Sequence, residues 1–162
     1  MAGVDALIAK GYIDPRKLTV TGGSGGGLLT AWTVTQTGRF AAAVSQYPVT
    51  NWITQAGSAD IGQLMTRWMK ATPWENPKQY LERSPLFHAA NVTTPTLVLT
   101  GEEDWRTPIG QSEEFYFALK MRGVDTALVR FPKEPHGIRG AFPSHRVAKV
   151  EYILAWMEKY VK

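Results

Sequence analysis

The sequence predicts an α/β fold, with a mostly parallel sheet of about four strands flanked by helices. Two observations lead to this prediction. Short apolar segments typical of strands alternate along the chain with segments of helical character, as in folds built from strand–helix–strand units. Glycines stand at the ends of several segments, and the strand segment at 96–100 is apolar enough to be buried on both faces, which is typical of parallel sheets.

The individual elements follow from residues that favour strand interiors or helix ends. The predicted strands cover residues 18–21, 40–47, 96–100 and 126–131. The predicted helices cover residues 5–10 and 28–37, a segment that opens at 107–108, and a last helix that starts near 144. Gly11, Gly38 and Gly123 end three of these helices, because glycine readily adopts the left-handed conformation that follows a helix. Residues 51–90 are expected to be irregular and helical.

The last helix has a clear apolar periodicity. Val147, Val150, Leu154, Met157 and Val161 are spaced three and four residues apart. This spacing places them on one face of a helix and predicts that the helix is amphipathic.

Composition and charge narrow the possible functions. Hydrophobic residues make up 44% and charged residues 20% of the chain, as in an ordinary globular protein, and residues 1–162 are expected to form one domain. The net charge of +4 comes from dispersed Lys and Arg, which argues against a nucleic-acid-binding surface. No apolar run reaches the roughly 18 residues that cross a bilayer, and the N-terminus lacks a signal-peptide pattern. We therefore expect a cytoplasmic protein without nucleic-acid or membrane partners.

A cluster of glycines around one serine follows the first predicted strand, where the sequence reads V-T-G-G-S-G-G-G-L-L-T. A dinucleotide-binding fingerprint needs glycine at its first, third and sixth positions, and a series that starts at Gly23 has Leu28 in the last place. A phosphate-binding loop needs lysine after its last glycine, but Gly27 is followed by Leu28. The cluster does match the Gly-x-Ser-x-Gly nucleophile elbow, between a strand and a helix as that motif requires.

The elbow would make Ser24 a nucleophile. Its tight backbone turn lifts the serine hydroxyl clear of the sheet and points the N–H of the next residue, Gly25, at the reaction centre as an oxyanion donor. Neighbouring residues that carried a Cβ are expected to collide in such a turn. The alternative is a flexible glycine loop that contains an incidental serine.

Two further residues complete a candidate catalytic triad. Asp104 directly follows the third predicted strand and His136 follows the fourth, which is the chain order of α/β-hydrolases. A serine needs a base to take its proton, and the histidine needs a carboxylate to fix its tautomer and stabilise its charged form. This mechanism requires no cofactor, and a chain without cysteine cannot build a thiolate metal site.

Other acidic residues and histidines are weaker candidates for the triad. Glu102 and Glu103 could replace Asp104 as the orienting acid. His88 lies in an apolar helical stretch, and His145 lies in the first turn of the last helix and not at a strand end. Three more acidic residues are interpreted as turn, cap or loop residues, namely Asp14, Asp60 and Asp125.

The ordered motifs resemble the catalytic domain of serine peptidases of the prolyl oligopeptidase family, above all its acylaminoacyl-peptidase and dipeptidyl-peptidase-like branches. The segments that carry the resemblance are 21–26, 48–52, 84–86, 101–108 and 134–137. The resemblance implies the C-terminal half of an α/β-hydrolase fold and the cleavage of short peptides or blocked amino acids, with side activity on esters. It assigns Ser24 as nucleophile, Asp104 as orienting acid and His136 as general base.

The resemblance also implies residues that bind substrate. Arg106 matches an arginine that binds a substrate carbonyl, and a structural salt bridge is the alternative role. Val49 and Trp52 match positions that line the pocket for the side chain before the scissile bond, and core packing is the alternative. The family usually has a bulky aromatic residue where this chain has Gly25, so we expect a looser elbow and a more open pocket wall.

The chain departs from the family in length. The family's sheet begins before the elbow strand, and that first half, with the loop that supplies the second oxyanion donor, has no counterpart in this sequence. We expect weak activity, because losing one such donor costs on the order of 100- to 1000-fold in rate. The strand at 18–21 is expected at a sheet edge, and such edges pair with other chains. The expectation is therefore a homo-oligomer, most simply a two-fold dimer.

Two functions follow as hypotheses. The first is a serine hydrolase acting on easy substrates, such as small esters or aryl amides of single amino acids. The second is a non-catalytic, self-associating fragment that retains the triad residues without a complete oxyanion hole.

Overall fold

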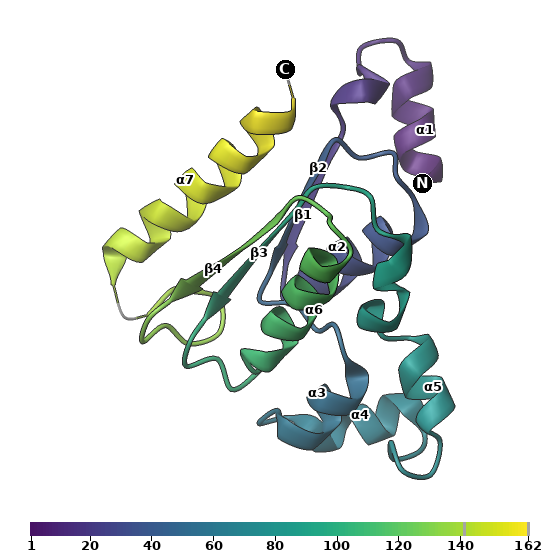
Figure 1. The fold of residues 1–162 in the computed structure, drawn as a ribbon, viewed down its shortest axis with the longest axis vertical. Coiled ribbons are helices and arrows are strands. Elements are labelled where there is room, and N and C mark those ends of the chain that lie inside the picture. The colour runs from purple at the N-terminus through teal and green to yellow at the C-terminus, as the bar shows by residue number, and fades with distance from the viewer. Residues whose placement is uncertain (141, 162) are drawn as a thin grey trace.

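The computed structural model describes residues 1–140 and 142–161, and a four-stranded sheet lies at its centre (Figure 1). The strands are β1 (Thr19–Gly23), β2 (Ala42–Gln46), β3 (Thr96–Gly101) and β4 (Thr126–Phe131). They are parallel throughout and lie in the order β1-β2-β3-β4. Each strand begins and ends within two residues of its predicted bounds. The predicted α/β fold with four parallel strands is therefore confirmed.

Helices connect the strands and cover both faces of the sheet. The α-helices are α1 (Ala2–Ala9), α2 (Gly25–Gln36), α3 (Trp52–Ser58), α4 (Gly62–Met69), α5 (Pro77–Glu82), α6 (Gly110–Met121) and α7 (Pro143–Tyr160), and the short 3₁₀-helices are η1 (Pro15–Lys17) and η2 (Pro85–Asn91). In Figure 1, α2 and α6 lie on one face of the sheet, α7 lies on the other, and α3 to α5 lie beyond the carboxyl ends of the strands. None of the helices that the structure describes is both long and apolar enough to cross a membrane.

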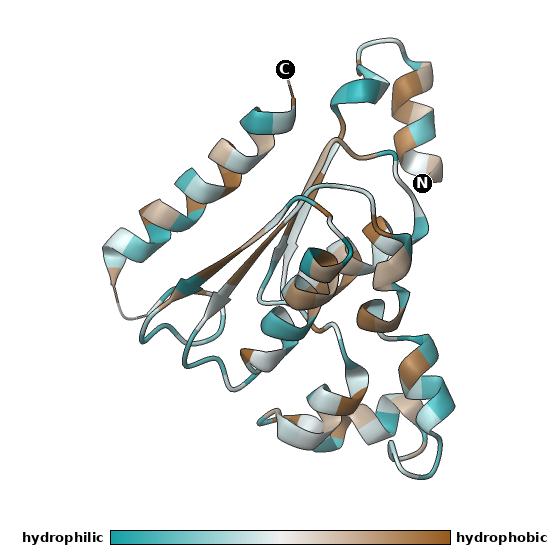
Figure 2. Cartoon of the chain, viewed as in Figure 1, coloured by the Kyte–Doolittle hydropathy of each residue, from teal (hydrophilic) through white to brown (hydrophobic). Residues whose placement is uncertain are grey.

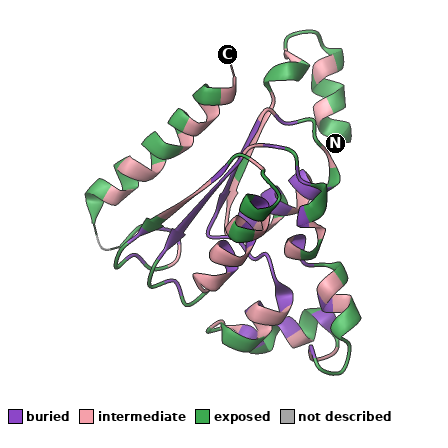
Figure 3. Ribbon diagram, in the orientation of Figure 1, coloured by how far each residue is buried: buried purple, intermediate pink, exposed green. Residues whose placement is uncertain are grey.

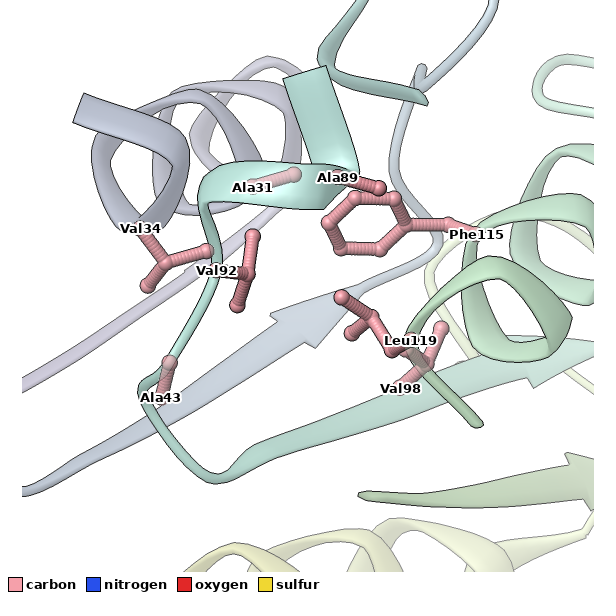
Figure 4. Packing of buried hydrophobic residues seen from close by; sticks show 8 residues of the cluster. All are labelled: Ala31, Val34, Ala43, Ala89, Val92, Val98, Phe115 and Leu119. Carbon is pink, nitrogen blue, oxygen red and sulfur yellow. The ribbon is translucent and has the colours of Figure 1, made fainter. Parts of the chain in front are cut away.

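One core lies between the sheet and the two helices α2 and α6 (Figure 4). Its buried residues come from these helices, from β2 and β3 and from the segment around η2, and they are Ala31, Val34, Ala43, Ala89, Val92, Val98, Phe115 and Leu119. Successive strand residues point to opposite faces, so Ala43 belongs to this core while Val44 packs on the α7 side. Figure 3 shows β2 and β3 buried along their lengths, which agrees with a sheet covered on both faces.

The helix α7 packs against the sheet through a different side from the predicted apolar face. The side chains of α7 that pack against the core on this face of the sheet, around Val44 and Leu99, are Ala148, Ile153, Trp156 and Met157. Of these, only Met157 belongs to the predicted face. Most of the predicted face is solvent-exposed, with 59% of Val147, 51% of Val150 and 52% of Leu154 accessible. Figure 2 shows apolar residues interleaved with hydrophilic ones along this helix. Because α7 carries two apolar stripes, spacing alone cannot tell which one the sheet covers.

The strand β1 lies at one edge of the sheet, as predicted. Among the described residues its backbone pairs only with β2. Its residues are half-buried or exposed, whereas every residue of β2 is buried. An edge of this kind offers backbone donors and acceptors to another strand. Coverage of this edge by a second copy in a two-fold dimer remains a prediction.

Candidate active site

The turn between β1 and α2 holds Ser24 in a strained backbone conformation. The strand ends at Gly23, the helix begins at Gly25, and Ser24 between them has φ 60° and ψ −118°. A positive φ is uncommon for a residue with a Cβ, and such strain persists only where the surroundings enforce it. The N–H of Ser24 donates to the carbonyl of Gln46 at 3.0 Å, and its own carbonyl accepts from the N–H of Leu28 at 2.9 Å. These bonds fix the serine at the end of the sheet.

Close packing explains some of the surrounding glycines but not all of them. A Cβ on Gly22 would overlap the backbone of Gly26, and a Cβ on Gly27 would overlap the carbonyl oxygen of Gln46. A Cβ on Gly25 or Gly26 would meet nothing within 4 Å. The expected collision of every neighbour is therefore wrong at these two positions, because they already belong to the first turn of α2 and face open space. The helix thus begins at Gly25, three residues earlier than predicted.

The structure brings the three predicted triad residues together. Nε2 of His136 lies 2.8 Å from Oγ of Ser24, and Nδ1 of His136 lies 2.8 Å from Oδ2 of Asp104. An ionised carboxylate only accepts hydrogen bonds, so the proton on Nδ1 faces Asp104 and leaves the Nε2 lone pair to the serine hydroxyl. The Asp104 side chain is fully buried, whereas 26% of the His136 side chain is exposed. The histidine is thus accessible while its carboxylate partner is shielded from water.

The loop after β3 holds the Asp104 carboxylate in place. Oδ1 accepts from the backbone N–H groups of Arg106 and Thr107, each at 2.9 Å. Oδ2 accepts from the Thr107 hydroxyl at 3.0 Å as well as from His136. Thr107 was not among the predicted site residues. An Asp followed three residues later by Thr is a pattern that favours such local side-chain bonds, so a signal for it was present in the sequence.

Tyr47 supports the histidine from the neighbouring strand end. Its ring lies edge-on to the His136 ring, with 5.0 Å between the centroids. The ring also fills the space where a side chain on Gly23 would be. Only 7% of Tyr47 is exposed, so this contact is shielded from solvent. Tyr47 follows β2 in the sequence, and no local pattern linked it to the triad.

A cavity of about 130 Å³ opens beside the serine. Its wall includes Ser24, the predicted oxyanion donor Gly25, and each residue predicted to bind substrate, namely Val49, Trp52 and Arg106. Val49 and Trp52 also pack with Met65 in a buried cluster, so the packing role and the lining role occur together. The open space next to Gly25 agrees with the expectation of a less enclosed pocket wall.

A larger hollow of about 420 Å³ lies beyond Trp52 and Trp68, which line both spaces. Its other walls come from Leu28, Leu29, Trp32, Met69 and Arg83. None of the three triad side chains lines it. Because the nucleophile Ser24 lines only the smaller cavity, that cavity is the candidate site.

Arg106 forms an ion pair, as in the alternative role considered for it, and the sequence did not identify its partner, Asp60. Its Nε and Nη2 donate to the two carboxylate oxygens of Asp60 at 2.7 and 3.1 Å. The bond to Arg106 is the main reason why the pKa of Asp60 lies below its usual value, and the same bond raises the pKa of Arg106. Asp60, which was predicted to be a turn, cap or loop residue, therefore also holds the Arg106 side chain. A guanidinium has five N–H donors, so two bonds to Asp60 do not exhaust its capacity to bind substrate.

The competing residues have other partners. Glu102 pairs with Arg130 at 3.0 Å, and Nε2 of His88 contacts the carbonyl of Glu82 at 2.9 Å. Three others have local or helix-end partners: Asp14 caps η1, Asp125 pairs with Lys159, and His145 contacts Glu134. The backbone N–H of Glu103 donates to the carbonyl of Glu134. Among the residues that the structure describes, no group of three or more His, Asp or Glu side chains is arranged to hold a metal ion.

The sequence and the structure of the chain both match known peptidases. Residues 1–162 match the prolyl oligopeptidase family. The chain is 44% identical to the uncharacterized peptidase YuxL of Bacillus subtilis, over 99% of this chain and 25% of that protein. It is 32% identical to the acylamino-acid-releasing enzyme of Arabidopsis thaliana, over 100% of this chain and 22% of that enzyme. The chain thus spans about a quarter of the length of these relatives.

Solved structures give the same result. The acylaminoacyl peptidase of Pyrococcus horikoshii superposes with a TM-score of 0.92 at 34% identity, over 99% of this chain and 27% of that one. A puromycin-hydrolyzing peptidase of Mycobacterium tuberculosis superposes with a TM-score of 0.89 at 33% identity, over 99% of this chain and 24% of that one. These neighbours are α/β-hydrolase peptidases. The chain therefore belongs to the prolyl oligopeptidase family.

Proposed function

We propose that the protein is a serine hydrolase that cleaves short peptides, acyl-amino acids or small esters through an acyl-enzyme on Ser24. One observation carries the proposal: the hydroxyl of Ser24, the ring of His136 and the carboxylate of Asp104 form a continuous hydrogen-bonded relay beside a cavity. Each group has the chemistry that its role needs, because serine becomes a nucleophile only when an oriented base removes its proton.

In the acylation step, Oγ of Ser24 forms a bond to the substrate carbonyl carbon while its proton moves to Nε2 of His136. The positive charge that develops on the imidazole is stabilised by the adjacent Asp104 carboxylate. Nε2 then gives the proton to the leaving nitrogen or oxygen, whose bond to the carbonyl carbon breaks. The products are the acyl-enzyme and a free amine or alcohol.

In the deacylation step, a water molecule adds to the acyl carbon and gives a proton to Nε2 of His136. The bond between this carbon and Oγ of Ser24 breaks, and the proton returns from Nε2 to Oγ. The carboxylic acid leaves, and the enzyme is restored without net consumption of any other reagent. Only hydrolysis has taken place.

The start of α2 favours the negative charge that develops on the carbonyl oxygen. The first N–H groups of a helix lack partners within the helix, and Gly25 is the first residue of this 12-residue helix. Its N–H directly follows the nucleophile, which is the position of an oxyanion donor in a nucleophile elbow. Each oxyanion donor contributes on the order of 100- to 1000-fold in rate.

The cavity favours a substrate with an apolar side chain next to the scissile bond. Apolar side chains supply much of its wall, including those of Leu28, Val49, Ile61 and Met65. Arg106 at the same cavity supplies N–H donors for a substrate carbonyl. The relatives agree with this class, since they include acylamino-acid-releasing enzymes and a puromycin-hydrolyzing peptidase.

Turnover of two chromogenic substrates tests the proposal. We expect the wild-type protein to hydrolyse p-nitrophenyl acetate and, more slowly, N-acetyl-leucine p-nitroanilide. Ser24→Ala should abolish both activities while the far-UV circular dichroism spectrum stays unchanged. Equal turnover by wild type and Ser24→Ala would contradict the proposal, because the activity would then not pass through the elbow serine.

The exposed edge of β1 supports the second candidate, a self-associating module. We propose that a second copy covers this edge, which would bring two elbow strands close to a two-fold axis. Gel filtration at micromolar concentration should then give the mass of a dimer. A compact monomer would contradict this proposal and would leave the hydrolase proposal unaffected.

A further inference from the structure

A buried carboxylate lies two residues before the candidate general base. Glu134 follows β4, and its side chain is fully buried. Burying an ionised carboxylate is costly unless hydrogen bonds replace its lost water. Glu134 has no place in the acylation chemistry, since Asp104 already orients His136. Its burial therefore needs a separate physical explanation.

The carboxylate closes the loop that carries the histidine. Oε2 of Glu134 accepts from the N–H of Gly140 at 3.1 Å, and Oε1 accepts from the N–H of Phe142 at 3.0 Å. Oε1 also lies 3.0 Å from Nδ1 of His145, in the first turn of α7. One side chain thus bonds the far end of the loop and the helix that follows it. Hydrogen bonds to a charged acceptor are about twice as strong as neutral ones.

The backbone of the same residue joins this loop to the acid loop. The carbonyl of Glu134 accepts from the N–H of Glu103 at 3.0 Å, one residue before Asp104. The two loops pack so closely here that a Cβ on Gly101 would overlap the Glu134 carbonyl. Glu134 therefore sits at the junction of the loops that carry the base and the acid.

The loop itself adopts backbone conformations that do not form without support. Gly137 has φ 91°, and Ile138, which is fully buried, has φ 52°. A positive φ is strained for a β-branched residue such as isoleucine. Lys149 of α7 adds a further tie, since its Nζ donates to the carbonyl of Gly137 at 3.1 Å. The position of His136 is thus imposed by contacts from outside the loop.

We propose that Glu134 is a positioning residue for His136. Through its bonds to Gly140 and Phe142, its carboxylate holds the segment after His136 in place, so that Nε2 stays in line with Oγ of Ser24. This inference rests on the proposed hydrolase function, but its effect on loop order does not. A glutamine of the same size cannot replace the carboxylate, because both oxygens accept from backbone N–H groups and an amide nitrogen would oppose one of these donors.

The experiment compares Glu134→Gln with two other variants in the full chain. The first readout is the reaction with a fluorophosphonate, resolved into a saturation constant and a limiting rate constant. The second is hydrogen exchange at the amides of Gly140 and Phe142. Phe115→Leu is the control. Phe115 is fully buried on the opposite face of the sheet, so its substitution should lower the stability of the protein without changing a contact of the His136 loop. His145→Gln changes a side-chain partner of the carboxylate and leaves its bonds to the N–H groups of Gly140 and Phe142 intact.

For Glu134→Gln we expect the limiting rate constant to fall on the order of 100-fold, because small displacements of a reacting group cost about that much. The saturation constant should change by less than about threefold, since the cavity is untouched. The amides of Gly140 and Phe142 should exchange faster than in Phe115→Leu of equal melting temperature. His145→Gln should give a smaller loss in the same direction, which keeps the test informative even if Glu134→Gln does not fold.

Two results would overturn the inference. One is a limiting rate constant that falls no further in Glu134→Gln than in the stability-matched Phe115→Leu. The other is unchanged exchange protection of Gly140 and Phe142 in the glutamine variant. A wild-type protein that does not react with the fluorophosphonate would contradict the hydrolase proposal instead, and the exchange comparison would still decide whether Glu134 orders the loop.

Discussion

The two turns that meet at the candidate site are held in contrasting ways. The elbow around Ser24 joins β1 directly to α2, and close backbone packing at Gly22 and Gly27 shapes it. The loop around His136 is longer, and buried side chains shape it, above all the carboxylates of Asp104 and Glu134. Both turns place their reactive atoms at the carboxyl edge of the sheet, 2.8 Å apart.

This contrast shows that two turns of one site can be fixed in different ways, one by close backbone packing and the other by hydrogen bonds to buried carboxylates. A turn held by close backbone packing tolerates no added atom at its packed positions, but it needs no charged partner. A loop held by buried carboxylates tolerates changes in bulk at its surface, but it fails when an acceptor becomes a donor. Substitutions that add a methyl group at Gly22 or Gly27 should therefore damage the elbow, and substitutions that convert a carboxylate to an amide should damage the histidine loop.

The largest effect is expected at Asp104. In Asp104→Asn, one of the two oxygens that accept four hydrogen bonds becomes an NH₂ donor, which opposes the Nδ1 proton of His136 or a backbone N–H. The wrong histidine tautomer should lower kcat on the order of 10⁴-fold with the fold intact. Ester hydrolysis and circular dichroism of the variant test this. A loss of less than about tenfold would mean that Asp104 does not orient the base.

The next effect separates the glycines of the elbow. Gly27→Ala places a methyl group against the Gln46 carbonyl and should lower the free energy of unfolding by about 3 kcal/mol, as overpacking does. Gly26→Ala is the matched control, because its methyl group would face open space in the same helix. Urea titration measures both. Equal destabilisation of the two variants would contradict a steric origin of the elbow.

The smallest effect is expected at the ion pair that orients Arg106. Asp60→Asn should raise KM about fivefold with kcat nearly unchanged, because half-exposed ion pairs contribute about 1 kcal/mol or less. Steady-state kinetics with the anilide substrate measures this, and Asp14→Asn, in another surface pair, is the control. A fall in kcat as large as that of Asp104→Asn would contradict this prediction, because Asp60 would then act on the triad and not on substrate binding through Arg106.

The same pair predicts a limited pH dependence. Arg106 stabilises the Asp60 carboxylate and lowers its pKa from the usual value of 3.8. The contribution of the pair is therefore fully present above pH 3.8 and is lost as the pH falls through the lower pKa of the folded protein. KM measured from pH 5 to pH 8 should not change because of Asp60. A rise in KM between pH 6 and pH 5 that Asp60→Asn removes would contradict this assignment.

The predictable part of the molecule is the part that local sequence encodes. Apolar segments with glycines at their ends predicted the four strands, and Ser24, Asp104 and His136 were found because each follows a strand of one parallel sheet. Parallel strands bring their carboxyl ends to the same edge. Residues far apart in sequence therefore converge once the order of the strands is known.

The part that escaped prediction depends on contacts that only tertiary structure creates. Asp60 meets Arg106 across 46 positions in the sequence, and Tyr47 reaches His136 from the end of another strand. Glu134 lies close to His136, but its partners Gly140 and Phe142 are backbone groups, which carry no residue-type signal. The buried side of α7 was missed because two apolar stripes on one helix satisfy the same spacing rule.

The central claim is that Ser24 and His136 form an assembled nucleophile and base. Intact-mass analysis after treatment with a fluorophosphonate tests it most directly, on wild type beside Ser24→Ala and His136→Ala. We predict one adduct on the wild-type protein, located on Ser24, and none on either variant. A folded wild-type protein that gains no adduct, or a His136→Ala variant that reacts as fast as wild type, would contradict the claim.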